Sequence, residues 1–308
     1  VTDHHDGMML AIAFESVVKL IAFVLVGVFA LGLLRNGVTN ALPGPSPFAP
    51  SALPQTFMTQ LLLAGAAILC LPRQFHAAVV EARADADIGI ARWLFPIYLV
   101  VFSVLVVPIT LAGLGMLSGS GITGDSFVLA LPMQAGALWL TLVACLGGFS
   151  AATGMVIVAC VALSTMISNE CVVPLVVRMR GGESRDYARL VLYVRRVAIA
   201  VIALLAWRYQ VAAAGNTALA SMGLLSYAAA AQFAPLMVAG VYWRGAHRRG
   251  AIAGLACGFA LWTYTLFLPT LARAGLFSTD FIEQGLFGLT WLRPEALAVK
   301  IGPPDQLL

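Results

Sequence analysis

Residues 136–160 read GALWLTLVACLGGFSAATGMVIVAC, and the chain stays uncharged from Ser126 to Asn169. A helix in water needs a polar face, whereas a helix that crosses a bilayer needs about 20 consecutive apolar residues. The stretch therefore predicts a membrane-spanning helix over 136–172. Of the 308 residues, 61% are hydrophobic and 10% are charged, whereas soluble domains are about 25% charged. Composition thus indicates an all-α, polytopic membrane protein.

Small and hydroxyl-bearing residues gather at the centre of this helix. Small residues four apart, such as Gly148 and Ala152 or Ser150 and Gly154, predict close approach of another helix. Ser150 and Thr153 lie three apart, so their oxygens share a face, as a hard cation or a polar solute requires. The alternative is that both hydroxyls bond back to carbonyls of the preceding turn. The candidates for an ion site here are Gly147, Ser150 and Thr153.

Seven crossings account for the hydropathy pattern. Most of the 18 Lys and Arg residues fall in 73–92, 178–196 and 244–249, on alternate loops, so the N-terminal end is expected in the cytoplasm and the tail outside. Because these charges line membrane borders, they do not indicate nucleic-acid binding. The expected spans are 7–34, 57–80, 93–117, 136–172, 190–213, 217–243 and 250–271, with a loop over 81–92 and an extramembrane tail over 273–308.

The second span has the pattern of a discontinuous helix. It is apolar from Phe57 only to Leu71, and Pro72 and Arg73 follow. Fifteen or so residues are short for a crossing, and transporters use such breaks to expose backbone groups to a substrate. Residues 127–135 are also too short to span, so we expect them to lie on the membrane or to re-enter it.

Glu15 and Lys19 place two ionisable groups inside the first span. Their i, i+4 spacing is the favourable order for an ion pair on a helix. Intramembrane charges usually face a bundle interior or an aqueous cavity. The alternative is a structural pair near the cytoplasmic border, with the Lys19 ammonium extended toward the headgroups.

Nothing in the sequence indicates an enzyme. The five Cys residues lie in apolar runs without metal-ligand spacing, and no nucleophile–base pair or phosphate-binding loop is found. We therefore expect no catalytic residue, no bound metal cluster and no cofactor other than a coupling ion, Na⁺ or H⁺.

The last span opens with Gly250, Gly254 and Gly258, a doubled GxxxG that predicts close helix packing.

Five stretches of the chain follow the pattern of a known family: AIAFESVVKL at 11–20, LPRQFH at 71–76, ARWLFP at 91–96, residues 147–155, and QFAP at 232–235 with Tyr242 and Trp243. In these stretches the chain resembles the sodium:solute symporter family, and most closely the transporter-like domain of CbrA-type sensor histidine kinases. This resemblance implies a partial LeuT-type inverted-repeat bundle: the end of repeat one (7–34), all of repeat two (57–243) and one extra helix (250–271).

The resemblance also implies site residues. The family's sodium site uses two adjacent hydroxyl residues, and here Ser150 is followed by Ala151, so sodium coupling, proton coupling and no coupling all stay open. The substrate region of the broken helix falls around Gly65, Ala66 and Leu69. The substrate-path candidates are Gly65, Ala66, Leu69, Gln74 and Gln232.

The implied function is transport of a small polar solute, such as an amino acid, across the bacterial inner membrane. The alternative is a sensory input domain of a membrane histidine kinase in a two-component signal-transduction system. The chain begins at Val1 without a signal peptide. We therefore expect a piece of a longer protein, whose preceding helices complete the site and whose kinase domain, in the alternative, follows Leu308.

Overall fold

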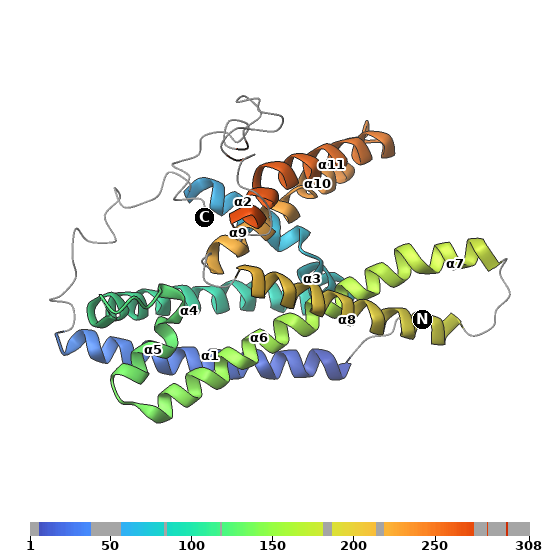
Figure 1. Cartoon of the computed structure of the whole chain (residues 1–308). Coiled ribbons are helices and arrows are strands. Elements are labelled where there is room, and N and C mark those ends of the chain that lie inside the picture. The colour runs from blue at the N-terminus through green and yellow to red at the C-terminus, as the bar shows by residue number, and fades with distance from the viewer. Residues whose placement is uncertain are drawn as a thin grey trace. The chain divides into compact units, whose positions relative to one another are not determined.

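The computed structural model describes residues 6–37, 57–82, 85–117, 119–180, 187–213 and 219–273, together with Ile282 and Pro294 (Figure 1). Within these ranges the backbone is helical between short turns and contains no strand, as the all-α prediction requires. The tail expected over 273–308 lies almost entirely outside the described residues. Contacts divide the chain into two compact units: Val1–Pro47 with His76–Val161, and Phe48–Phe75 with Ala162–Leu308.

The first unit is built on α1 (Asp6–Arg35) and α4 (Asp85–Leu117), which lie side by side (Figure 1). Its buried core joins Val26 and Ala30 of α1 to Ile109 and Ala112 of α4, all at most 3% exposed. The remaining elements are η3 (His76–Val80), η4 (Gly124–Ser126), α5 (Phe127–Gln134) and α6 (Leu138–Met166) as far as Val161.

Helix α5 is the segment expected to lie on the membrane or to re-enter it. It packs against both α1 and α4. Phe127 and Leu131 are buried in the same core as Val26 and Ile109. A helix of 8 residues spans about 12 Å, too little to cross a bilayer. One face of α5, with Phe127, Leu131 and Pro132, is therefore covered by protein within this unit, whereas Leu129 and Met133 are exposed.

The second unit contains more helices and more interruptions. Helix α2 packs on α9 and α10, α11 packs on α9, and α8 packs on the π-helical segment η5. Its elements are α2 (Phe57–Cys70), α3 (Pro72–Phe75), the end of α6, η5 (Ile167–Val172), α7 (Val173–Arg180), α8 (Tyr187–Ala213), α9 (Leu219–Ala231), α10 (Ala234–Tyr242), α11 (Arg248–Trp262), η6 (Thr263–Phe267) and α12 (Leu268–Arg273).

Six helices among the described residues are long and apolar enough to cross a membrane, and a bent pair raises the count to as many as seven. The bent pair, Phe57–Cys70 with Pro72–Val80, turns by 48° at the residue where the sequence predicts a break, as a broken span or a re-entrant loop would. The six single spans are Gly7–Arg35, Ala86–Leu117, Leu138–Val176, Arg189–Val211, Ser221–Tyr242 and Arg248–Ala272. The composition of these helices is that of a membrane-embedded protein.

One boundary expectation is wrong. The loop expected over 81–92 is replaced from Asp85 onward by the first turns of α4. Charged residues do not end a helix, and an acidic residue in the first turn, such as Asp87, favours the positive end of the helix dipole. The span expected over 217–243 is present as Ser221–Tyr242, with a turn at Gln232 and Phe233 just before Pro235.

The contact between α4 and α5 gives a test of this core. A Cβ at Gly113 would overlap the Phe127 ring, whereas a Cβ at Gly89, on the same helix, would meet nothing within 4 Å. Gly113→Ala should lower the free energy of unfolding by about 1–3 kcal/mol through overpacking. Gly89→Ala should be neutral or stabilise by up to about 1 kcal/mol through helix propensity. Thermal unfolding in detergent measures both, and equal midpoints would contradict the packing.

Candidate functional site

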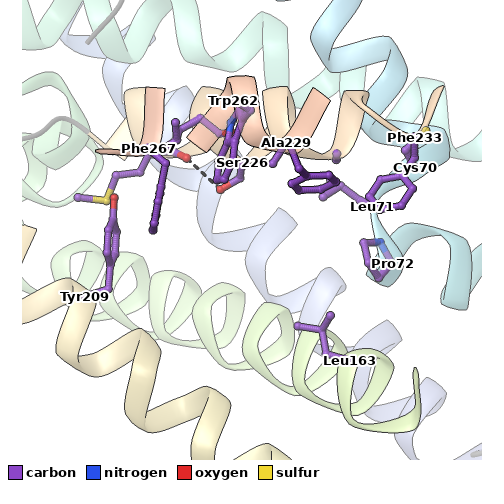
Figure 2. Close-up of a pocket in the computed structure, with 14 residues that line it drawn as sticks. Cys70, Leu71, Pro72, Leu163, Tyr209, Ser226, Ala229, Phe233, Trp262 and Phe267 are labelled. Carbon is purple, nitrogen blue, oxygen red and sulfur yellow. Dashed lines mark hydrogen bonds between the residues drawn. The ribbon is translucent and has the colours of Figure 1, made fainter. Parts of the chain in front are cut away.

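A cavity of about 530 Å³ lies within the second unit (Figure 2). Three of its lining residues belong to interruptions of the helices. Leu71 is the non-helical residue between α2 and α3, Phe233 lies in the turn between α9 and α10, and Phe267 ends η6. Irregular backbone at membrane depth is tolerated where it is buried in protein or lines a cavity, and π-helical turns occur often at functional sites.

Prolines cause two of these interruptions. Pro72 has no N–H, so the carbonyl of Ile68 lacks the donor that the fourth following residue normally supplies. Pro235 removes the corresponding donor from the carbonyl of Ala231 in the same way. The sequence therefore creates carbonyl groups without helical partners next to the residues that line the cavity.

Aromatic rings form a continuous wall of the cavity. The Phe233 and Phe259 ring centroids are 5.6 Å apart and the planes meet at 69°. Phe259 meets Trp262 edge to face at 6.0 Å, and Trp262 stacks on Phe267 at 5.2 Å with an interplanar angle of 19°. Such contacts stabilise each ring beyond the effect of burial alone. The wall is thus held in place by its own ring–ring contacts.

Two polar hydrogens of the cavity lining bond to the protein itself, and the phenol hydroxyl of Tyr209 is a further polar group in the lining. Ser226 Oγ donates to the carbonyl of Met222 at 3.0 Å, and Trp262 Nε1 donates to the carbonyl of Leu225 at 3.2 Å. The Cys70 thiol lies 3.7 Å from the sulfur of Met237. Among the described lining residues none is charged. The cavity therefore offers apolar surface to a ligand.

The predicted substrate-path residues lie outside the lining of this cavity. Gly65 is exposed, and a Cβ built there would meet nothing within 4 Å, while Leu69 is 61% exposed. Gln232 packs its Oε1 atom against Gly258, where a Cβ would overlap it. None of the five candidates (Gly65, Ala66, Leu69, Gln74 and Gln232) is among the described lining residues.

The sequence thus pointed to the break at Pro72 and missed the aromatic wall. Phe259 and Trp262 are three residues apart, so they share a helix face. Both residues follow the glycine repeat of α11. A Cβ at Gly258 would overlap Gln232, whereas a Cβ at Gly254 would meet nothing within 4 Å. Aromatic residues on one face after a close-packing glycine are the signal that would have found the wall.

The ion-site candidates lie in the first unit, on α6. Ser150 Oγ donates to the carbonyl of Glu15 on α1 at 3.2 Å. Thr153 Oγ1 donates to the carbonyl of Phe149 at 2.7 Å, which is the local bond considered as the alternative. The two hydroxyls share a helix face but bond to different helices. Each hydroxyl therefore has a backbone carbonyl as its partner.

Glycines set the contact between α6 and α1. A Cβ at Gly147 would overlap the Ala22 methyl, and a Cβ at Gly154 would overlap a carboxylate oxygen of Glu15. A Cβ at Gly148 would meet nothing within 4 Å, whereas α1 makes the expected close approach at Ser150 and Gly154, both of which contact Glu15. Gly147 and Gly154 are seven apart, two helical turns, and therefore fall on one face.

The side chains of Glu15 and Lys19 lie in different surroundings. Oε2 of Glu15 is buried and has no hydrogen-bond partner among the described residues. Nζ of Lys19 lies 5.7 Å from the centroid of the Tyr98 ring and 6.0 Å from that of Phe102, both on α4. Aromatic faces attract an ammonium group, most strongly where water is excluded. No ion pair between Glu15 and Lys19 is present in the described part of the first unit.

Comparisons of the chain with protein-family models, curated proteins and solved structures give no match. The chemistry of the two units therefore carries the functional inference. The first unit provides close helix packing around buried polar groups, and the second provides an apolar cavity between interrupted helices. Neither arrangement places a nucleophile beside a base among the described residues, and these residues contain no group of three potential metal ligands.

The contact of Gly147 with Ala22 can be tested by compensation. Gly147→Ala should lower the free energy of unfolding by about 1–3 kcal/mol, because the new methyl overlaps that of Ala22. Combining it with Ala22→Gly should restore most of the loss, since the Cβ would then face the Cα of residue 22 at 3.8 Å. Unfolding in mixed micelles measures the double-mutant cycle. Gly148→Ala is the matched control, and failure of Ala22→Gly to rescue would contradict the contact.

Proposed function

We propose that the chain forms the solute-binding transmembrane part of a secondary transporter of the sodium:solute symporter type, in the bacterial inner membrane. The observation that carries the proposal is the cavity at the interrupted helices of the second unit. A helix that only anchors a protein is most stable when it is continuous, because each break removes backbone hydrogen bonds. Breaks around a cavity are what solute binding at membrane depth requires.

The proposal includes a LeuT-type arrangement of the helices. In this arrangement α1 ends the first repeat, and the five spans from the α2–α3 pair to the α9–α10 pair form the second. Helix α11 is the additional helix. The bend of 48° after Cys70 supports the assignment, since the second repeat of this fold opens with a discontinuous helix.

The solute is proposed to be a small molecule such as an amino acid. Pockets for small molecules are mostly apolar with few polar groups, and volumes of about 300–1,000 Å³ are typical. The cavity, at about 530 Å³, is large enough for a single amino acid. The carbonyls of Ile68 and Ala231, which lack helical donors, are acceptors that an ammonium group of the solute can use.

The break at Pro72 gives the test of this proposal. Pro72→Ala restores an N–H to the backbone, so the helix can continue through residue 71 and the carbonyl of Ile68 regains a partner. Uptake of a radiolabelled amino-acid mixture into vesicles from cells expressing the protein should then fall to near background. The measurement is the initial rate of uptake, normalised to the amount of protein in the membrane.

Pro96→Ala is the matched control. Pro96 also lies inside a membrane helix, α4, but it is exposed and belongs to the first unit. Its replacement should leave uptake unchanged. Uptake that survives Pro72→Ala in full, or wild-type vesicles that accumulate no amino acid, would count against the proposed function.

A further inference from the structure

We infer that the aromatic wall of the cavity, formed by Phe233, Phe259, Trp262 and Phe267, receives an uncharged apolar ring of the ligand and excludes both carboxylates and ammonium groups. This inference rests on the proposed function in one respect: it takes the ligand of the cavity to be the transported solute. The selectivity itself follows from the wall of the cavity. Any charged part of the ligand must then remain outside the wall, toward the helix breaks.

Anions are excluded because the aromatic wall itself offers them no free donor. The hydroxyl of Ser226 and the indole N–H of Trp262 are bonded to backbone carbonyls of α9, at 3.0 and 3.2 Å. The thiol of Cys70 faces a thioether sulfur. A carboxylate that entered would exchange its water for at most one neutral donor of the lining, the phenol hydroxyl of Tyr209, and for no positive charge, which is strongly unfavourable.

Cations are excluded by the way the rings face one another. An ammonium group binds an aromatic residue through the open face of its ring. Trp262 and Phe267 each cover one face of the other ring at 5.2 Å, and Phe259 meets Trp262 edge to face. No acidic side chain is found among the described lining residues to balance a positive charge. A neutral ring needs only surface contact, which this wall supplies.

The labelling rate of the Cys70 thiol can report whether a ligand occupies the cavity. It is a free thiol that lines the cavity and is partly accessible, so a ligand should shield it from N-ethylmaleimide. Cys257 is a free, exposed thiol on α11 of the same unit and is outside the lining. Its labelling reports any general effect of a probe on the membrane.

The experiment compares three probes with the same benzene ring: benzyl alcohol, benzylammonium and benzoate, at neutral pH. Labelling of each cysteine is followed over time by mass spectrometry of the wild-type protein in membranes. We expect benzyl alcohol to protect Cys70 at a concentration roughly tenfold lower than either charged probe, a difference of about 1.4 kcal/mol. Cys257 should label at the same rate throughout.

Two variants assign the protection to the aromatic wall. Trp262→Leu should abolish the protection of Cys70, because it removes the central ring of the wall. Trp207→Leu changes a tryptophan that is 58% exposed on α8 and outside the lining, and protection should persist. If Trp262→Leu does not fold, the comparison of the three probes on the wild-type protein decides alone.

The inference is overturned if either charged probe protects Cys70 as well as benzyl alcohol does, or if Cys257 is protected equally. It is also overturned if a folded Trp262→Leu variant retains full protection. Labelling needs no transport, so its outcome is separate from that of uptake. Ring selectivity without uptake would contradict the proposed function alone, and uptake without ring selectivity would contradict this inference alone.

Discussion

Every backbone N–H and C=O inside a bilayer must find its partner within the protein, because the hydrocarbon offers none. This constraint explains why the described part of the chain is helical, and it gives meaning to the places where a helix stops. Pro72 and Pro235 each remove a donor that a continuous helix would use. Both interruptions adjoin the same cavity, so the departures from regular structure in the second unit are concentrated where a ligand can use them.

The two units achieve packing by different chemistry. In the first unit, Gly147 and Gly154 have no side chain, so α6 can lie close to α1. At this distance the hydroxyl of Ser150 reaches the carbonyl of Glu15 on the neighbouring helix. Association in a bilayer depends on such close packing, since lipid tails are as apolar as the side chains. In the second unit, large rings fill space and hold one another, from Phe233 to Phe267. Glycine contacts suit a fixed helix pair, whereas an aromatic wall suits a surface that another molecule touches.

Much of the fold follows from the sequence, because span length and the break at Pro72 depend on covalent properties of the residues themselves. The start of α4 did not follow, since the charges of 81–92 mark the membrane border but do not end a helix. The choice between Gly147 and Gly148 as the contact residue depends on the neighbouring helix, which no local pattern specifies. The cavity was located only to the nearest helix break, because Phe233 joins the rings of Phe259, Trp262 and Phe267 only through tertiary packing.

The π-helical segment η6 determines how Phe267 meets Trp262. Five residues along an α-helix, at about 100° per residue, would turn the second ring well away from the first. A π turn, which bonds residue i to residue i+5, brings positions five apart back over one another. The number of residues between Trp262 and Phe267 therefore matters for the contact between the two rings. A single-codon insertion between them would move the second ring about 100° further round the helix and out of the wall, whereas a single-codon deletion would leave the rings four residues apart, on one face of a regular α-helix.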